Sequence, residues 1–490
     1  MKKKLIVILA AALCLVLLAG CGDVVISPQP TAEQTVTESE GGETQIALTD
    51  GGIEISGGGA GAKGSALTIS SPGSYRVSGS LSDGSITVDT GEVKGDVTIT
   101  LAGADVNCLD GAAINVVRAK NVYLVLADGS ENRLVSGREG DSGALGADAN
   151  GAAIFSESDL DILGGGRLEI FGYINNGVTC KDDLDIKGGT IVVTAAKNGI
   201  KGSESVEISG GEITVSAQND GVKATSVKKD GKGFVSVSGG RLEISCGGDG
   251  ISAESYLSVT GGEISVDAHG TAEASSCKAL KAKTGLEISD GELKLTSTGH
   301  SVHCTEDIVI SGGTLTLRST GGKGVSAHGT LMISGGVIDA ESADDGLESK
   351  TAVVISGGGI SVLAGADGIK AGDSLSNTGT IEIMGGVVDV SAHSDPINAK
   401  TSAVISGGWF SGVGTPKRVK GFSPDSTQLS LVFALRGGEN TSAEVRGASG
   451  KVIGNVNALC GYTMAIFSCP ELTEGEYSLV LGTLSADARA

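Results

Sequence analysis

The sequence predicts an all-β protein, a parallel β-helix in which a rung of about 22 residues is repeated and stacked. Three observations predict it: short runs of alternating apolar residues, corners rich in glycine, and a nearly constant step between similar segments. Residues 181–224 contain the unit twice in succession. Three short strands and three corners per step are typical of a β-helix, whose rungs lie about 4.8 Å apart.

The alternation within each unit predicts strands with one buried face. Leu184 and Ile186 alternate with polar residues before a glycine pair, and the next alternating run ends at Asn198-Gly199. Glycine pairs and Asn-Gly steps are expected to supply the positive φ of sharp corners. The residue before the corner glycine recurs at Asn176, Asn198, Asp220, Asp249, Lys278, His300, Lys323, Asp345, Asp367 and Asp395. A leucine-rich repeat has a similar period, but the sequence lacks its leucine and asparagine frame and its helical segment.

The first 21 residues predict a secretory signal peptide that ends in a lipoprotein motif. A basic head and an apolar run precede Leu18-Ala19-Gly20-Cys21, and polar sequence follows at once. These features favour a lipid-modified Cys21 over the alternative, a plain transmembrane anchor. The chain is therefore expected at the bacterial cell surface, attached by its lipid to the outer face of the cytoplasmic membrane.

Changes in composition divide the rest of the chain. Residues 22–47 are rich in Pro, Thr, Glu and Gln and are expected to form a disordered linker. Residues 48–161 alternate more loosely and are expected to form the N-terminal coils and cap. Residues 162–416 carry the regular repeat of the β-helix. The period is lost in residues 417–490, which predict antiparallel hairpins that cap the last rung.

Charge and motifs exclude several classes of function. The net charge of −22 argues against a nucleic-acid partner, because a phosphate-binding surface must be basic. It also argues against simple ionic attraction to an acidic polymer. Seven cysteines remain beyond Cys21 and show no CxxC pairing. Cys180 and Cys304 take the place of small residues in other rungs and are expected to be small core residues, and a Cys460–Cys469 disulfide is left open. The five histidines lack the spacing of metal ligands and are expected on the surface.

Stacking would place acidic and amide residues of successive rungs side by side, as a site for calcium. Several oxygen ligands within about 5 Å, without His or Cys, suit Ca²⁺ better than Mg²⁺. In the alternative, each Asn or Asp makes its corner by bonding local backbone. Calcium is favoured for the clusters because stacked carboxylates repel one another without a counter-ion. The predicted ligands are Asp182, Asp183, Asn198, Asn219, Asp220, Asp249, Asp344, Asp345 and Asp367.

A second column of outward-facing residues lies beside the acidic one. Lys201 and Lys223 are expected to hold sugar carboxylates, with Asn176 nearby, or to act as a base if their pKa is depressed. The alternative is a solvated face on which the lysines neutralise the aspartates. The column comprises Thr179, Lys201, Lys223, Ser252, Lys281, His303, Ser326, Glu348, Lys370 and Asn398.

The run ESDLDILGGGRLEIFGYINNGVTCKDDLDIKGGTIVV and the NDGVKA that follows it resemble the clostridial surface carbohydrate-binding β-helix family. SYRVSGSLSDGSITVDT, DGAAI and LADGSENRL extend the resemblance over nearly all of the mature chain. It implies a right-handed helix, bound calcium, and binding of plant-cell-wall polysaccharide, including cellulose and acidic pectin. The family resembles pectate lyases in architecture without being regarded as enzymes. Asn176, Lys197 and Asn198 depart from its usual residues, which is expected to weaken one calcium site.

The sequence thus predicts a non-catalytic lipoprotein that binds polysaccharide at a calcium-organised surface, with no protein partner. A shared cation would let an acidic protein hold an acidic glycan. Two alternatives stay open: a calcium-dependent polysaccharide lyase with Lys201 or Lys223 as its base, and a structural surface spacer or adhesin.

Overall fold

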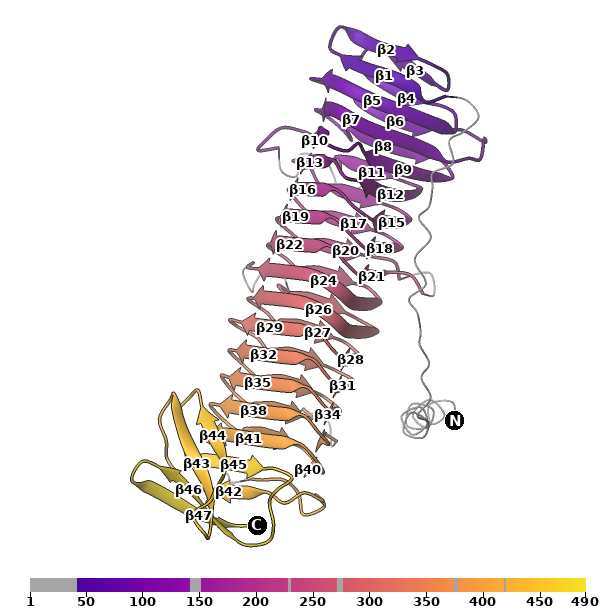
Figure 1. Cartoon of the computed structure of the whole chain (residues 1–490). Coiled ribbons are helices and arrows are strands. Elements are labelled where there is room, and N and C mark those ends of the chain that lie inside the picture. The colour runs from indigo at the N-terminus through magenta and orange to yellow at the C-terminus, as the bar shows by residue number, and fades with distance from the viewer. Residues whose placement is uncertain (1–41, 142–150, 228–230, 271–275, 374–377, 418–419) are drawn as a thin grey trace. The chain divides into compact units, whose positions relative to one another are not determined.

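The computed structural model describes residues 42–141, 151–227, 231–270, 276–373, 378–417 and 420–490. The expected signal peptide, with Cys21, and most of the expected linker lie outside these residues. Among the described residues, no helix is long and apolar enough to cross a membrane. Residues 41–490 form one compact unit, in which about 13 parallel rungs of about 24 residues are stacked (Figure 1). The predicted parallel β-helix is confirmed.

Each regular rung contributes one strand to each of three faces. Face 1 is a separate sheet of β3 (Ala60–Lys63), β4 (Ala66–Ile69), β6 (Ser85–Asp89), β8 (Ile114–Arg118), β11 (Ile154–Ser156), β14 (Val178–Cys180), β17 (Ile200–Gly202), β20 (Val222–Ala224), β23 (Ile251–Ala253), β25 (Leu280–Ala282), β27 (Val302–Cys304), β30 (Val325–Ala327), β33 (Leu347–Ser349), β36 (Ile369–Ala371) and β39 (Ile397–Ala399).

The other two faces belong to one continuous sheet. Face 2 holds β9 (Asn121–Leu126), β12 (Asp159–Gly164), β15 (Asp183–Ile186), β18 (Ser205–Ile208), β21 (Phe234–Val237), β28 (Asp307–Ile310), β31 (Thr330–Ile333), β34 (Ala352–Ile355), β37 (Thr380–Ile383) and β40 (Ser402–Ile405). Face 3 holds β10 (Glu131–Ser136), β13 (Arg167–Gly172), β16 (Thr190–Ala195), β19 (Glu212–Ala217), β22 (Arg241–Cys246), β29 (Thr314–Ser319), β32 (Val337–Ser342), β35 (Gly359–Ala364), β38 (Val387–Ala392) and β41 (Trp409–Gly414). The long strands β5 (Gly73–Leu81), β7 (Val97–Cys108), β24 (Tyr256–Ala268) and β26 (Gly285–Ser297) run along both faces.

The alternating sequence produces both the core and the outward columns. In β16, Ile191 and Val193 are buried inside the helix, whereas Val192 between them points outward. Parallel pairing without slippage stacks equivalent residues, so Lys201 lies beside Thr179 on one side and Lys223 on the other. The predicted column of outward residues continues in register to Asn398.

Glycine has two different roles at the corners. The second glycine of a pair has the expected positive φ, as at Gly211 (φ +91°). The expectation for Asn-Gly corners is wrong, because Gly199 does not have positive φ, and neither does Gly221 at the equivalent Asp-Gly corner. A Cβ on Gly221 would instead lie 2.3 Å from Cγ2 of Ile244 and 2.7 Å from the carbonyl oxygen of Gly250. Close packing between rungs requires glycine here.

Antiparallel pairing closes both ends of the stack. The first strand, β1 (Thr44–Thr49), starts before the predicted boundary at residue 48 because Ile46 and Leu48 are already buried; it pairs with β2 (Gly52–Ser56). At the other end, β41 pairs with β45 (Met464–Ser468), which also pairs with β42 (Leu431–Phe433). A four-stranded antiparallel sheet follows, of β43 (Thr441–Gly447), β44 (Val452–Ala458), β46 (Glu476–Leu481) and β47 (Leu484–Arg489).

The seven cysteines of the described residues are buried, which agrees with the expectation of small core residues. Cys180 and Cys304 end strands of face 1 and are fully buried. Cys460 and Cys469 are not bonded to each other.

Candidate functional site

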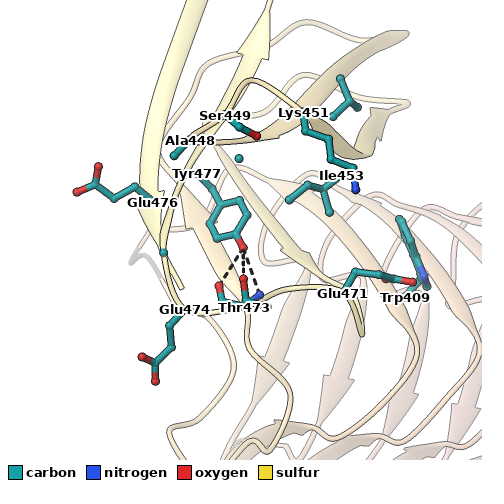
Figure 2. A pocket seen from close by; sticks show the side chains of 13 residues that line it. Trp409, Ala448, Ser449, Lys451, Ile453, Glu471, Thr473, Glu474, Glu476 and Tyr477 are labelled. Atoms are coloured by element: carbon teal, nitrogen blue, oxygen red, sulfur yellow. Dashed lines mark hydrogen bonds between the residues drawn. The ribbon is translucent and has the colours of Figure 1, made fainter.

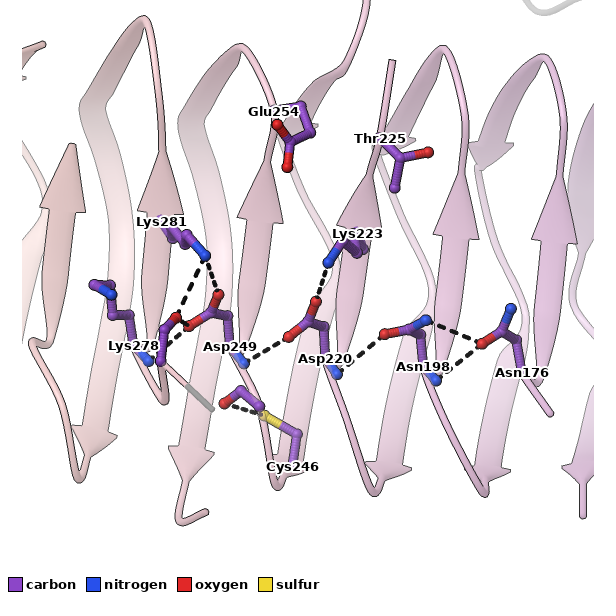
Figure 3. A network of polar contacts seen from close by, with 12 residues as sticks. Asn176, Asn198, Asp220, Lys223, Thr225, Cys246, Asp249, Glu254, Lys278 and Lys281 are labelled. Atoms are coloured by element: carbon purple, nitrogen blue, oxygen red, sulfur yellow. Dashed lines mark hydrogen bonds and ion pairs between the residues drawn. The ribbon is translucent and has the colours of Figure 1, made fainter. Parts of the chain in front are cut away.

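Side chains at the Asn/Asp corner reach the next rung and accept a hydrogen bond from the backbone N–H of the equivalent residue there (Figure 3). Asn176 Oδ1 accepts from the N–H of Asn198 at 3.0 Å, and Asp220 Oδ1 accepts from that of Asp249 at 2.8 Å. These bonds form a ladder between rungs, because each Asn, Asp or His member offers an acceptor atom to the next rung. The same contact joins Asn198 to Asp220, Asp249 to Lys278, His300 to Lys323, Asp345 to Asp367, and Asp367 to Asp395.

The second carboxylate oxygen of the ladder aspartates contacts lysine. Asp220 Oδ2 lies 2.6 Å from Lys223 Nζ, and Asp249 Oδ2 lies 2.7 Å from Lys281 Nζ (Figure 3). Burial raises the pKa of Asp249, but hydrogen bonds from Lys281 and Ser276 outweigh it and hold that pKa below its ordinary value. Lysine therefore supplies positive charge at two positions predicted to hold calcium.

The predicted ligands nearer the C-terminus have similar partners. Asp345 is 1% exposed, and its Oδ2 lies 2.6 Å from Lys323 Nζ and 2.8 Å from Lys370 Nζ. Asp367 Oδ2 accepts a hydrogen bond from Asn398 Nδ2 at 2.7 Å. Asp344 lies 3.5 Å from Lys323, whereas Asn219 near the first group is exposed. Calcium binding at these residues stays a prediction.

Three carboxylates converge at the corner between faces 1 and 2. Asp182 and Asp183 occupy one rung, Asp159 begins the equivalent strand of the preceding rung, and their oxygens lie within 4.8 Å of one another. Among the described residues, this is the one group of three or more His, Cys, Asp or Glu side chains that close together. Oxygen donors without sulfur or nitrogen are the ligands that hard cations such as Ca²⁺ prefer.

The electrostatics of this corner favour a bound cation. Burial, followed by the charge of Asp159 and a hydrogen bond with Glu204, raises the pKa of Asp182 to about 6. Lys232 partly offsets the negative charge of the corner, because its Nζ lies 2.6 Å from Asp183 Oδ2 and 3.3 Å from Glu204 Oε2. A divalent ion beside Asp182 would stabilise its charged form, because opposite charge lowers a carboxyl pKa.

Lys201 stands out in the outward column because its neighbours are cations. Burial lowers its pKa, and the charges of Lys181, Lys223 and Lys197 lower it further. The pairing places Lys201 beside Thr179, and Asp182 follows Thr179 by three residues. A cluster of lysines thus adjoins the three-aspartate corner in a chain whose net charge is −22.

Two features of this surface escaped the sequence analysis. One is Asp159, which is absent from the predicted ligands. The signal that could have found it is the motif Asp-Leu-Asp-Ile, which occurs at residues 159–162 and again one rung later at 183–186, so that its aspartates stack. The prediction that all five histidines lie on the surface is also wrong in part. His300, His303 and His328 are half-buried, with ring centroids 5.4 and 5.2 Å apart, and burial lowers the pKa of His300 to about 4 and that of His303 to about 3.

Stacked rungs with polar columns define a β-solenoid that presents long, repetitive surfaces. A protein-family model described as "Carbohydrate-binding domain-containing protein" matches residues 63–324 and 313–428, so the chain belongs to that family. A relative of the same description from Acetivibrio thermocellus is 33% identical over 129 residues, which are 26% of this chain and 45% of the relative. The match therefore spans less than half of that relative's length.

A similar solved structure is entitled a polysaccharide lyase-like protein from C. thermocellum, in a gadolinium derivative. It is 25% identical to this chain, the alignment covers 59% of this chain and 96% of the other, and the TM-score is 0.42.

Proposed function

We propose that this protein binds an acidic polysaccharide through a divalent cation, Ca²⁺, held at the three-aspartate corner. The observation that carries the proposal is the convergence of Asp159, Asp182 and Asp183 in a member of a carbohydrate-binding family. The donors fit this ion, since they are all carboxylate oxygens, and burial together with the neighbouring carboxylates Asp159 and Glu204 raises the pKa of Asp182. Glu204 would complete the ligand set.

The lysines beside the corner suit the same ligand. A bound cation would supply the charge that attracts glycan carboxylates to an acidic protein. Lys201 and Lys223, one rung apart, would then contact carboxylates of neighbouring sugars along the chain. Asn176 lies in the ladder beside them. Sites on rigid strands hold such groups at a fixed spacing, which favours binding of a polymer over a single sugar.

Retention on immobilised polygalacturonate tests the proposal. The chain is expected to be retained with Ca²⁺ and released by a chelator. Asp182→Asn and Asp183→Asn should reduce retention about tenfold or more, as expected when one ligand of a site is lost. Asp487→Asn, an exposed aspartate on β47, is the matched control and should bind as the unaltered chain does. Retention that is indifferent to both chelator and Asp182 would refute the role of the ion.

One observation favours a second function, cleavage of the polysaccharide. A base for β-elimination must be neutral near the working pH, and the lowered pKa of Lys201 moves in that direction. Unsaturated products absorb in the ultraviolet, so incubation with polygalacturonate and Ca²⁺ distinguishes the two functions. We propose binding without cleavage and expect no absorbance to develop. Absorbance that develops and is lost in Lys201→Ala would establish the lyase instead.

We further propose that the protein is a cell-surface lipoprotein attached through Cys21. The support is the motif Leu18-Ala19-Gly20-Cys21 after an apolar run. Growth with labelled palmitate should label the unaltered chain and leave Cys21→Ser unlabelled. A chain that stays with the membrane and takes no label would point to the plain transmembrane anchor.

A further inference from the structure

A pocket of about 530 Å³ lies between the last rung of the solenoid and the C-terminal sheet (Figure 2). Its lining comes from β41, the turn between β43 and β44, and the loop before β46. The volume is within the range of sites that hold small molecules or a few sugar units. Most of the lining residues follow residue 428, where the family match ends. None of Asp159, Asp182 and Asp183 lines it, so the pocket is distinct from the three-aspartate corner.

Trp409, the only tryptophan of the chain, forms one side of the pocket. Its ring is held in place by Phe467, which packs edge-on with ring centroids 5.6 Å apart. The backbone of Gly454 also packs close to this ring, since a Cβ there would lie 2.8 Å from Cζ3 of Trp409. Tyr477 lines another side, and its hydroxyl is fixed by donating to the carbonyl oxygen of Thr473 at 2.9 Å. The pocket is thus rigid and partly aromatic.

The charge of the lining selects the kind of ligand. Three glutamates and one lysine line the pocket, so an anionic glycan would be repelled. An uncharged sugar has polar edges that can bond to these side chains and an apolar face that can pack on an aromatic ring. The charged lining residues are Lys451, Glu471, Glu474 and Glu476.

An exposed apolar strip leads from Trp409 along face 3. Val387 pairs with Trp409 in register, Gly359 with Val387, and Val337 with Gly359. Val337 is 56% exposed and Val387 is 52% exposed, although both lie on strands whose other outward residues are mostly polar. Gly359 leaves open space between them. Three rung steps of about 4.8 Å make the strip about 14 Å long, the length of a few sugars.

We propose that this pocket and strip bind an uncharged polysaccharide, with one sugar packed on Trp409 and the following sugars along Val387, Gly359 and Val337. The inference rests on the carbohydrate-binding part of the proposed function and adds a second glycan class at a second site. It needs no cation.

The single tryptophan makes the inference directly testable by fluorescence. A soluble, neutral β-1,4-linked gluco-oligosaccharide is titrated into the full chain with chelator present, up to about 10 mM. A saturable change in tryptophan emission is expected, whereas an oligogalacturonate of equal length should cause none. If no neutral oligosaccharide changes the emission, or if oligogalacturonate changes it equally, the proposal is overturned.

Variants measured by calorimetry locate the site. Trp409→Leu keeps an apolar contact with Phe467 and is expected to weaken binding about tenfold, as is Val387→Ser, which changes an open surface away from the ring. Val93→Ser, 58% exposed and outside the pocket and strip, is the matched control. Unchanged affinity in a folded Val387→Ser chain would remove the strip, and unchanged affinity in Trp409→Leu would remove the pocket.

The two glycan sites fail independently in these experiments. Asp182→Asn should keep the chelator-resistant binding of the neutral oligosaccharide, and Trp409→Leu should keep the Ca²⁺-dependent retention on polygalacturonate. Loss of both activities in either variant would contradict two separate sites.

Discussion

Most corner residues of the solenoid supply an acceptor atom to the next rung, and only some of these acceptors carry a charge. Asn176, Asn198 and His300 each accept the backbone N–H of the following rung without carrying a carboxylate. At Asp220 and Asp249, the second carboxylate oxygen takes a lysine as partner. Each ladder bond satisfies a backbone N–H at the corner of a rung, and a buried N–H without an acceptor lowers stability.

Two substitutions at Asp220 separate its acceptor role from its charge. Asp220→Ala leaves the N–H of Asp249 without its acceptor and should lower the free energy of unfolding by about 2 kcal/mol. Asp220→Asn keeps the acceptor and loses the contact with Lys223, which should cost less than about 1 kcal/mol. Urea denaturation followed by circular dichroism measures both. If Asn costs as much as Ala, charge dominates at this corner.

Asp182 predicts a pH-dependent effect of calcium on thermal stability. Its pKa is raised to about 6 from 3.8, so the folded chain binds this proton more tightly than the unfolded chain. The stabilisation this gives is present below pH 3.8 and is lost as the pH rises through about 6. At about pH 7.5 the ionised carboxylate destabilises the folded chain, and Ca²⁺ should reverse this by binding the folded state.

Differential scanning calorimetry should therefore show that Ca²⁺ raises Tm at about pH 7.5 and has much less effect at about pH 4.5. Asp182→Asn removes the destabilising charge. Without Ca²⁺ at about pH 7.5, the Tm of this variant should therefore be at least that of the unaltered chain, and up to about 2 °C higher. It should also lose most of the response to Ca²⁺. An equal response at both pH values would contradict this account.

At the scale of the element, the sequence predicts strands, corners and their stacking because the pattern is periodic and local. The column from Thr179 to Asn398 lies in the predicted register because regular pairing keeps equivalent residues aligned. The partners of the acidic side chains depend on distances across rungs, which the pattern does not contain. Lys232 reaches Asp183 from 49 residues away, out of an insertion between β20 and β21, so no spacing in the sequence indicates the contact.

The corner glycines set how closely successive rungs can pack. Gly221→Ala would place a Cβ 2.3 Å from Ile244 and 2.7 Å from the carbonyl oxygen of Gly250. This should destabilise the chain by about 3 kcal/mol, since both residues are part of the packed next rung. Gly61→Ala, where a Cβ meets nothing within 4 Å, is the control and should cost less than about 1 kcal/mol. Chemical denaturation compares the two. Similar losses in both would show that backbone freedom, and not contact between rungs, decides the need for glycine.

At the scale of the folded unit, a stack of parallel strands leaves an open edge and an open core at each end. The N-terminal end is closed by the hairpin of β1 and β2. At the other end, β45 pairs with β41, and Ile466 and Met464 cover the core beside Phe410. The period of the sequence predicts where the stack stops, but not that the same C-terminal segment also builds a pocket on Trp409.

Removal of residues 416–490 should therefore make the solenoid associate end to end more strongly than the full chain does. The deletion exposes β41 as a free edge beside Phe410, and an uncovered apolar edge strand pairs with other chains. Light scattering should detect dimers or larger species that the full chain does not form. Adding Val413→Lys to the shortened chain places a charge on the same edge and should restore the monomer, because a lysine there opposes edge pairing. A shortened chain that stays monomeric without that lysine would show that the C-terminal sheet is not needed as a cap.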